Sequence, residues 1–201
     1  GAVARGVYAI TGGLGGLGLR AAAMLVEAGA SGLLLASRSG CVVRDGQGLD
    51  SQLQTTSALA AVFVCDTADT HDTSTLFCAA SRLAGVLHSA GAGDKGLLIE
   101  LDLRRLQWIC ASKAMGARYL QCAAASASLL ETRVLFSSVG SGLGNEGQAN
   151  YAVANACLDA HASSQRARGT SACSLQWPLV GGAGMGASDF SAMGVRRLVI
   201  T

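Results

Sequence analysis

The sequence predicts an α/β fold of three layers, in which a doubly wound parallel sheet lies between two layers of helices. Two observations support this prediction. Segments typical of strands alternate with segments typical of helices along nearly the whole chain, and the strand segments are continuous apolar runs rather than runs that alternate in polarity. Continuous apolar runs are typical of parallel strands that are buried on both faces.

The first half of the chain contains two strands and one clear helix. A strand over Val7–Thr11 leads into a cluster of glycines, and a helix over Leu17–Ala28 follows it and ends at Gly29. A second strand is predicted at Leu33–Ser37. The next stretch, Gly40–Ser57, is polar and irregular, so we expect a loop with a reduced helix there.

The same alternation continues through the middle of the chain. A third strand is predicted at Val62–Cys65 and a short helix at Thr73–Arg82. A fourth strand at Gly85–Ser89 is followed by one long or broken helix over Asp102–Ser128.

The last elements place polar residues at strand and helix ends. A fifth strand covers Arg133–Ser138, and a glycine-rich loop, Val139–Asn150, is expected to fold back over a cleft. A helix over Ala149–Arg168 and a sixth strand over Ser171–Trp177 complete the pattern.

Length and charge restrict the class of protein. The 201 residues suit a single domain with one core, half of them are hydrophobic, and 14% are charged. A net charge of +2 gives no indication of nucleic-acid binding, and the pair Arg104–Arg105 is interpreted as part of a solvated face. No apolar run reaches the ~18 residues of a membrane span.

The cysteines indicate neither disulfides nor a metal site. There are seven, an odd number, and none forms a CxxC pair. We therefore expect buried free thiols in a reducing, cytoplasmic compartment, and no bound metal.

The turn after the first strand predicts a dinucleotide site in a Rossmann-like fold. Glycines there would let backbone N–H groups approach a pyrophosphate, and the N-terminus of the following helix favours an anion. A tight turn alone would also explain the glycines, but the strand–turn–helix context favours the dinucleotide. The residues of this turn are Thr11, Gly12, Gly13, Leu14, Gly15, Gly16, Leu17 and Gly18.

The end of the second strand indicates which dinucleotide binds. An acidic residue there would bind the ribose 2′-hydroxyl of NAD, whereas this chain has Ser37, Arg38 and Ser39. An arginine with flanking hydroxyls suits a 2′-phosphate, so NADPH is predicted, the alternative being a surface arginine. At the end of the third strand, Cys65 and Asp66 are expected beside the adenine, although Asp66 could instead cap a helix.

Three polar residues suggest a reductase site. Ser138 ends the fifth strand, Tyr151 lies thirteen residues later near the start of a helix, and Asn155 follows on the same helical face. A tyrosine can protonate the alkoxide that hydride addition creates at a ketone, and a serine hydroxyl can hold the carbonyl oxygen. Each residue alone would more commonly be a cap or a packing residue.

A family resemblance rests on five segments. TGGLGGLG, SRSG, LHSAG, VLFSS and GNEGQANYAVANACLDA resemble the ketoreductase domains of modular polyketide synthases, from about Gly6 to about Gly186. The resemblance implies a short-chain dehydrogenase fold and NADPH-dependent reduction of a β-ketoacyl thioester. It also implies that Lys113 and Asn155 exchange the lysine and asparagine positions of free-standing relatives, and that Ser89, Ala90 and Gly91 line the nicotinamide ribose.

The resemblance also implies partners. The 201 residues would form one NADP(H)-binding catalytic domain of a larger synthase, without the structural subdomain that such ketoreductases usually have. An acyl carrier protein would deliver the β-ketoacyl chain, and the structural subdomain would be a neighbour. Two alternatives stay open: a catalytically silent module that binds NADPH or serves as a scaffold, and a free-standing short-chain dehydrogenase, against which Asn155 argues.

The same resemblance identifies positions that would control the stereochemistry. They are Gly93, Asp94 and Lys95 after the LHSAG segment, Leu143 in the glycine-rich loop, and Gln148 before the tyrosine. Relatives that give the L-alcohol usually have tryptophan at the position of Leu143, and those that give the D-alcohol usually have Leu-Asp-Asp at positions 93–95. This chain lacks the tryptophan, and Lys95 in place of the second aspartate removes the usual marker of the D class as well. The absence of the tryptophan and the resemblance of residues 147–151 to the D class favour the D-alcohol.

Overall fold

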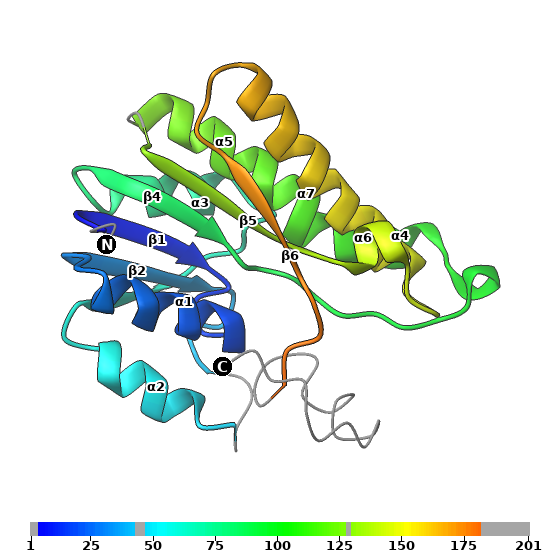
Figure 1. Cartoon of the computed structure of the whole chain (residues 1–201), viewed down its shortest axis with the longest axis horizontal. Coiled ribbons are helices and arrows are strands. Elements are labelled where there is room, and N and C mark those ends of the chain that lie inside the picture. The colour runs from blue at the N-terminus through cyan, green and yellow to red at the C-terminus, as the bar shows by residue number, and fades with distance from the viewer. Residues whose placement is uncertain (1–3, 43–46, 128–129, 182–201) are drawn as a thin grey trace.

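A computed structural model of the chain describes residues 4–42, 47–127 and 130–181. It contains a six-stranded sheet with helices on both faces (Figure 1), and every strand pair is parallel. The strand order is β3-β2-β1-β4-β5-β6. Successive strands are added on one side of β1 up to β3 and then on its other side from β4, so the order reverses between β1 and β4. The predicted doubly wound parallel sheet is thereby confirmed, and ligand crevices in such sheets lie at the carboxyl ends of the strands beside this reversal.

The strands are close to the predicted ones. Their bounds are β1 Val7–Thr11, β2 Gly32–Ser37, β3 Ala60–Val64, β4 Leu83–His88, β5 Thr132–Ser138 and β6 Cys173–Trp177. The third strand begins two residues before its predicted start, and Cys65 follows it instead of ending it.

The helices depart from prediction at several points. Their bounds are α1 Gly16–Glu27, α2 Leu49–Thr56, α3 Thr70–Cys78, α4 Leu103–Cys110, α5 Gly116–Ala127, α6 Gly140–Leu143 and α7 Ala149–Ala167. Helix α3 begins three residues before and ends four residues before its predicted bounds, Thr73–Arg82. Of the two alternatives predicted for residues 102–128, one long helix or a broken one, the structure shows the broken helix, because the π-helical turn η2 (Ala111–Met115) separates α4 from α5. A 3-10 turn, η1 (Leu98–Glu100), precedes α4, and the predicted loop before Tyr151 contains α6.

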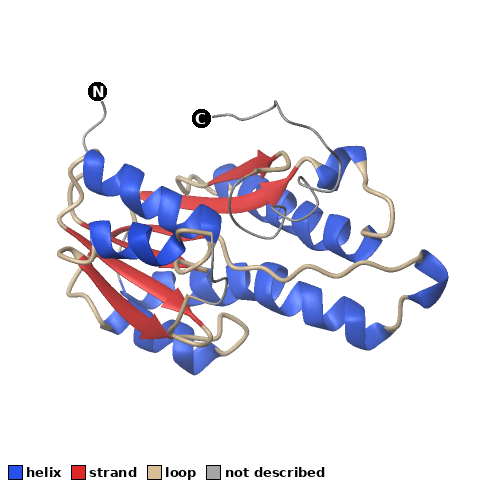
Figure 2. Cartoon of the chain, turned by 90° about the horizontal axis from the view of Figure 1, so that it is seen from below, coloured by secondary structure: helices blue, strands red, loops and turns tan. Residues whose placement is uncertain are grey.

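Alternate strand residues pack into two hydrophobic clusters on opposite faces of the sheet. Tyr8 and Ile10 of β1 pack with Leu19 of α1 on one face, whereas Ala9 packs with Leu120 of α5 on the other. Figures 1 and 2 show the two layers of helices, with α1 and α2 on one side and α3, α5 and α7 on the other. The core therefore supports a fixed row of strand ends, and Ser138 lies at one of them.

The two edge strands differ from the expectation of burial on both faces. Val64 of β3 is 70% exposed and Val62 is 44% exposed, and Leu175 of β6 is also exposed. The central strands β1, β2 and β4 are largely buried, as predicted. An edge strand is flanked by another strand on one side only, so solvent reaches its side chains from the other side. An apolar run at the edge of the sheet therefore need not be buried.

The prediction of buried thiols holds only in part. Every cysteine is free, but Cys65 alone is fully buried, and Cys41, Cys78, Cys122 and Cys157 are exposed. No helix within the described ranges is both long and apolar enough to cross a membrane.

Candidate active site

The first of two adjoining cavities lies at the carboxyl ends of β1 and β2. It has a volume of about 630 Å³ and is lined by thirteen of the sixteen residues predicted to bind a dinucleotide. Cys41, Leu49, Thr67 and Ser112 also line it, although the sequence analysis did not identify them. The predicted residues that line this cavity are Gly12, Leu14, Gly15, Gly16, Leu17, Gly18, Ser37, Arg38, Ser39, Cys65, Ser89, Ala90 and Gly91.

The glycine turn fits the pyrophosphate of a dinucleotide. Gly12 has a φ of +68°, and a β-carbon there would lie 2.7 Å from the backbone nitrogen of Ala90. No side chain caps α1, and its first turn contains no acidic residue. The N-terminus of α1 therefore offers its unpaired N–H groups and its partial positive charge to an anion in the cavity.

Three predicted cofactor residues do not line the cavity. Thr11 and Gly13 are buried beneath the turn, and the hydroxyl of Thr11 is hydrogen-bonded to His88. Asp66 accepts a hydrogen bond from the backbone N–H of Ala68, in a local turn. The alternative role of Asp66 as a helix cap is wrong, because Asp69 is the residue that caps α3.

Arg38 is placed where a 2′-phosphate would be recognised. Its side chain is exposed at the rim of the cavity, and it forms no hydrogen bond or ion pair within the described part of the chain. Of the neighbouring hydroxyls, Ser39 donates to the carbonyl of Cys41, whereas Ser37 accepts from the N–H of Gly40 and keeps its own hydrogen to donate. The guanidinium is the positively charged group here that can bind an anion.

The second cavity contains all the predicted catalytic residues except Asn155. Ser138, Tyr151 and Lys113 line it, and its volume is about 630 Å³. Leu17 and Ser89 line both cavities, so the space for a dinucleotide opens into the space around the tyrosine. The elements that meet here are β5, which ends at Ser138, the first turn of α7 and the π turn η2.

Tyr151 is positioned as a protonated acid. Burial raises the pKa of its phenol, and hydrogen bonds from the side chains of Asn155 and Ser138 partly offset that rise. The Ser138 hydroxyl oxygen accepts from the N–H of Gly140, which leaves its own hydrogen free to donate. A tyrosine with a raised pKa keeps its proton at neutral pH, as a proton donor must.

Lys113 is buried beside the tyrosine. Its side chain is 3% exposed, and its ammonium donates to the carbonyl oxygen of Phe136 at 3.0 Å and lies 5.3 Å from the centre of the Tyr151 ring. Burial lowers the pKa of Lys113 to about 8, and Asp159 opposes that shift. A cation near a phenol favours the phenolate, so we expect Lys113 to assist proton transfer from Tyr151.

Asn155 supports the start of the catalytic helix. Its amide nitrogen donates to the backbone carbonyl of Tyr151 at 2.8 Å, and the residue is fully buried. Its side-chain oxygen has no hydrogen-bond partner within the described residues. A buried acceptor without a partner is costly to the folded state.

The positions expected to control stereochemistry surround the second cavity. Gly93, Asp94, Lys95, Leu143 and Gln148 all line it, and Leu143 is 86% exposed. An exposed leucine does not close the cavity as a packed indole would.

Arg105 corrects one prediction from the sequence. Its guanidinium donates twice to Asp94, with both bonds at 2.8 Å, so it does not lie on a solvated face as expected. Asn150 also donates to Asp94, at 2.7 Å, and accepts from the N–H of Tyr151. The ion pair with Arg105 and the bond from Asn150 lower the pKa of Asp94. Neither Arg105 nor Asn150 has a sequence motif of its own, although Asn150 adjoins the tyrosine.

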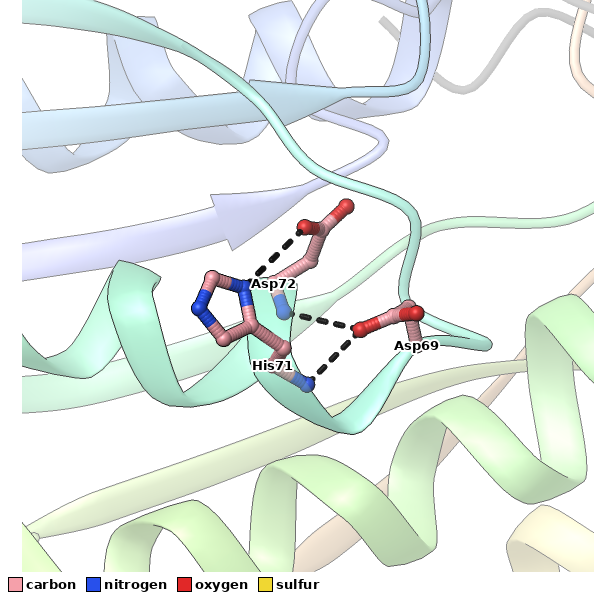
Figure 3. A group of neighbouring side chains, drawn as sticks. All are labelled: Asp69, His71 and Asp72. Carbon is pink, nitrogen blue, oxygen red and sulfur yellow. Dashed lines mark hydrogen bonds and ion pairs between the residues drawn. The ribbon is translucent and has the colours of Figure 1, made fainter.

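Asp69, His71 and Asp72 form a group with the spacing of metal ligands, shown in Figure 3. Asp69 accepts hydrogen bonds from the N–H groups of His71 and Asp72 at the start of α3 (Figure 3). Asp72 accepts from the N–H of Asp66. Helix capping and a local turn explain this group.

Comparison with known proteins agrees with this geometry. The family model described as the KR domain matches residues 6–182. Polyketide synthase GfsB of Streptomyces halstedii is 37% identical over 190 residues, which cover 93% of this chain and 3% of GfsB. A solved structure of A-type ketoreductases from a modular polyketide synthase is 33% identical, with a TM-score of 0.85 over 98% of this chain and 43% of that chain.

A more distant structure shows the fold alone. The short-chain dehydrogenase/reductase of Brucella melitensis described as a glucose/ribitol dehydrogenase is 19% identical, with a TM-score of 0.77 over 94% of this chain and 78% of that chain. The fold is thus that of the short-chain dehydrogenases/reductases, and its two cavities place the features of a dinucleotide site beside Tyr151 and Lys113. The chain belongs to the KR domain family, and it spans only a small part of the synthases that it matches.

Proposed function

We propose that this chain is the catalytic domain of a ketoreductase that uses NADPH to reduce a β-ketoacyl thioester carried by an acyl carrier protein. The observation that supports this most is the position of Tyr151, Ser138 and Lys113 in one cavity that adjoins a second cavity with the features of a dinucleotide site. The small share of the matched synthase that the chain spans supports a place within a larger, multidomain synthase.

The first cavity would hold the cofactor. The turn over residues 12–18 and the N-terminus of α1 would bind the pyrophosphate, and Arg38 would bind the 2′-phosphate that distinguishes NADPH from NADH. Ser89, which lines both cavities, and Ala90 and Gly91, which line the first, would line the nicotinamide ribose. A bound reduced nicotinamide supplies a hydride to the carbon of the ketone.

The second cavity would complete the reaction by proton transfer. Ser138 donates a hydrogen bond to the ketone oxygen and orients it. As the new carbon–hydrogen bond forms, the electron pair of the carbonyl π bond moves to oxygen, and the Tyr151 hydroxyl transfers its proton there. The product is the β-hydroxyacyl thioester, and the tyrosine then regains a proton from solvent. Lys113, close to the ring, stabilises the phenolate during transfer.

The configuration of the product is a finer part of this proposal. The open position at Leu143 supports the expectation from the sequence that the D-alcohol is formed, because no bulky indole confines the acyl chain there. Chiral chromatography of the alcohol from a carrier-bound substrate measures it, and a predominantly L product would contradict this part.

The proposed activity is tested by following NADPH oxidation with a β-ketoacyl thioester of a small thiol, and by identifying the hydroxyacyl product by mass spectrometry. The expected result is turnover that depends on both substrates. If NADPH binds tightly but neither the small-thiol thioester nor the carrier-bound thioester is reduced, the chain is instead a silent binding module.

A further inference from the structure

The π-helical turn that contains Lys113 has two of its carbonyl groups bound by side chains from other elements. The hydroxyl of Thr67, after β3, donates to the carbonyl oxygen of Ser112 at 3.2 Å. A ring nitrogen of His88, the last residue of β4, lies 3.0 Å from the carbonyl oxygen of Lys113 itself. Wide turns of this kind interrupt the regular hydrogen bonding of a helix and occur frequently at functional sites.

The contacts of His88 define which ring nitrogen carries the proton. A carbonyl oxygen can only accept, so Nε2 of His88 must carry hydrogen and donate to Lys113. Nδ1 then accepts from the hydroxyl of Thr11, 2.7 Å away at the end of β1. Complete burial and the nearby charge of Lys113 lower the pKa of His88 to about 4, so the ring is neutral and both bonds persist at neutral pH.

The sequence leaves space for these two side chains at Gly116, the first residue of α5. A β-carbon at this position would lie 2.9 Å from the hydroxyl oxygen of Thr67 and 3.0 Å from Cε1 of His88. Both distances are shorter than ordinary contacts with a β-carbon. The absence of a side chain at Gly116 therefore allows Thr67 and His88 to reach the turn.

The turn determines where the lysine side chain begins. A lysine side chain loses much conformational entropy when its ammonium is held in one place. If the backbone is already anchored, less entropy is lost in placing the ammonium. From this anchor the ammonium reaches Phe136 O and the Tyr151 ring. The charged or titratable groups around it are His88 on β4 and Tyr151 and Asp159 on α7.

We propose that His88 and Thr67 are positioning residues for Lys113, which hold the π turn so that the lysine ammonium lies beside Tyr151. His88 is also hydrogen-bonded to Thr11, the last residue of β1. It therefore links the π turn to the glycine turn at residues 12–18, which follows Thr11. The inference rests on the proposed reductase function, in which Lys113 assists Tyr151.

The test compares four variants of the 201-residue chain. His88→Met and Thr67→Val remove the two donors with little change in volume, whereas His88→Gln keeps an amide N–H that can reach the Lys113 carbonyl. Thr56→Val is the matched control, because Thr56 is also buried and also donates to helix carbonyls, but within α2, remote from the site. Two quantities are measured: kcat and KM between pH 6 and pH 10, and the titration of Lys113 by NMR of ¹³C-labelled lysine.

The expected result is a loss in kcat of ~10-fold or more in His88→Met and Thr67→Val, since small misplacements of site groups cost this much, with a smaller change in the KM for NADPH. The Lys113 titration should move upward in both variants as the ammonium gains access to water. His88→Gln should recover most of kcat, and Thr56→Val should match the wild type.

Three outcomes would overturn the inference. The first is that kcat and the Lys113 titration are unchanged in folded His88→Met or Thr67→Val. The second is that Thr56→Val loses as much kcat as these variants. The third is that His88→Gln does not recover kcat. If His88→Met fails to fold, Thr67→Val and Gly116→Ala apply the same test, since the added methyl of the latter displaces both donors. An inactive wild type would refute the proposed function, and the lysine titration would still decide the inference.

Discussion

Arg105 and Asp94 form a two-pronged ion pair, in which Nε donates to Oδ2 and Nη2 to Oδ1, each at 2.8 Å. The pair joins α4 to the segment that follows β4. Because Asn150 donates to the same carboxylate and accepts from the N–H of Tyr151, the pair also reaches the first turn of the catalytic helix. Parallel bonds of this kind are stronger and more directional than single contacts.

Replacing Arg105 should therefore affect the site more than an ordinary surface pair would. We expect Arg105→Ala to lower kcat/KM for the thioester ~10-fold, because Asp94 and Asn150 lose their fixed positions next to Tyr151. The melting temperature should fall as well. Arg82→Ala is the control, since its pair with Glu131 is 70% and 64% exposed and such pairs contribute little. Equal effects of the two variants would contradict a special role for Arg105.

Tyr151→Phe tests the proton donor. The variant keeps the ring and its packing, so NADPH should bind as in the wild type, whereas turnover should fall by at least ~10²-fold, the usual scale for a positioned acid. Binding is measured by cofactor fluorescence and turnover by NADPH oxidation. Turnover close to that of the wild type would show that another group supplies the proton.

The pH profile tests Lys113. Burial lowers its pKa to about 8, so the ammonium is charged below that pH and neutral above it. If the charge assists Tyr151, kcat/KM should fall as the pH rises through about 8. Lys113→Met should be slower at neutral pH by ~10-fold or more, and its alkaline limb should move upward toward the pKa of Tyr151, which burial raises. A variant with the same limb as the wild type would show that a different group titrates.

The parts of the site that could be predicted are those encoded by short spacings. The glycine turn at residues 12–18 lies between a strand and a helix in the sequence itself, and Ser138 and Tyr151 each stand at the end of a recognisable element. The pair of Arg105 and Asp94 could not be predicted, because it joins two loosely patterned segments. Thr11 and His88 lie 77 positions apart, and only the pairing of β1 with β4 brings them together.

The sequence left open whether the helix over residues 102–128 is broken, and the π turn within it could not be located for a related reason. The predicted helix over residues 102–128 consists mostly of good helix-forming residues, and Gly116 is its only glycine. The donors that favour the wider turn, Thr67 and His88, come from distant parts of the chain. Local preference thus indicates a helix, while tertiary contacts determine how that helix is broken.

Arg38→Ala tests the choice between NADPH and NADH. We expect NADPH to bind ~10-fold more weakly and NADH to bind almost as before, because only the former has the 2′-phosphate that a guanidinium binds. The difference should shrink at high salt, since Arg38 is exposed and its charge is screened. Arg118→Ala, at an exposed position on α5, is the control. Equal weakening of both cofactors would mean that Arg38 does not bind the phosphate.

The buried His88 should make the fold sensitive to acid. Its pKa is about 4 in the folded chain, against an ordinary value of 6.5, so in this interval the unfolded chain binds a proton that the folded chain does not. Stability is therefore retained above pH 6.5 and is lost progressively as the pH falls to about 4, by about 3 kcal/mol from this residue. Denaturant unfolding at several pH values measures it. His88→Gln should lose less stability than the wild type over that range, whereas His71→Gln should behave like the wild type, because the His71 side chain is 89% exposed. If wild type and His88→Gln lose the same amount, the histidine is not the group that senses the acid.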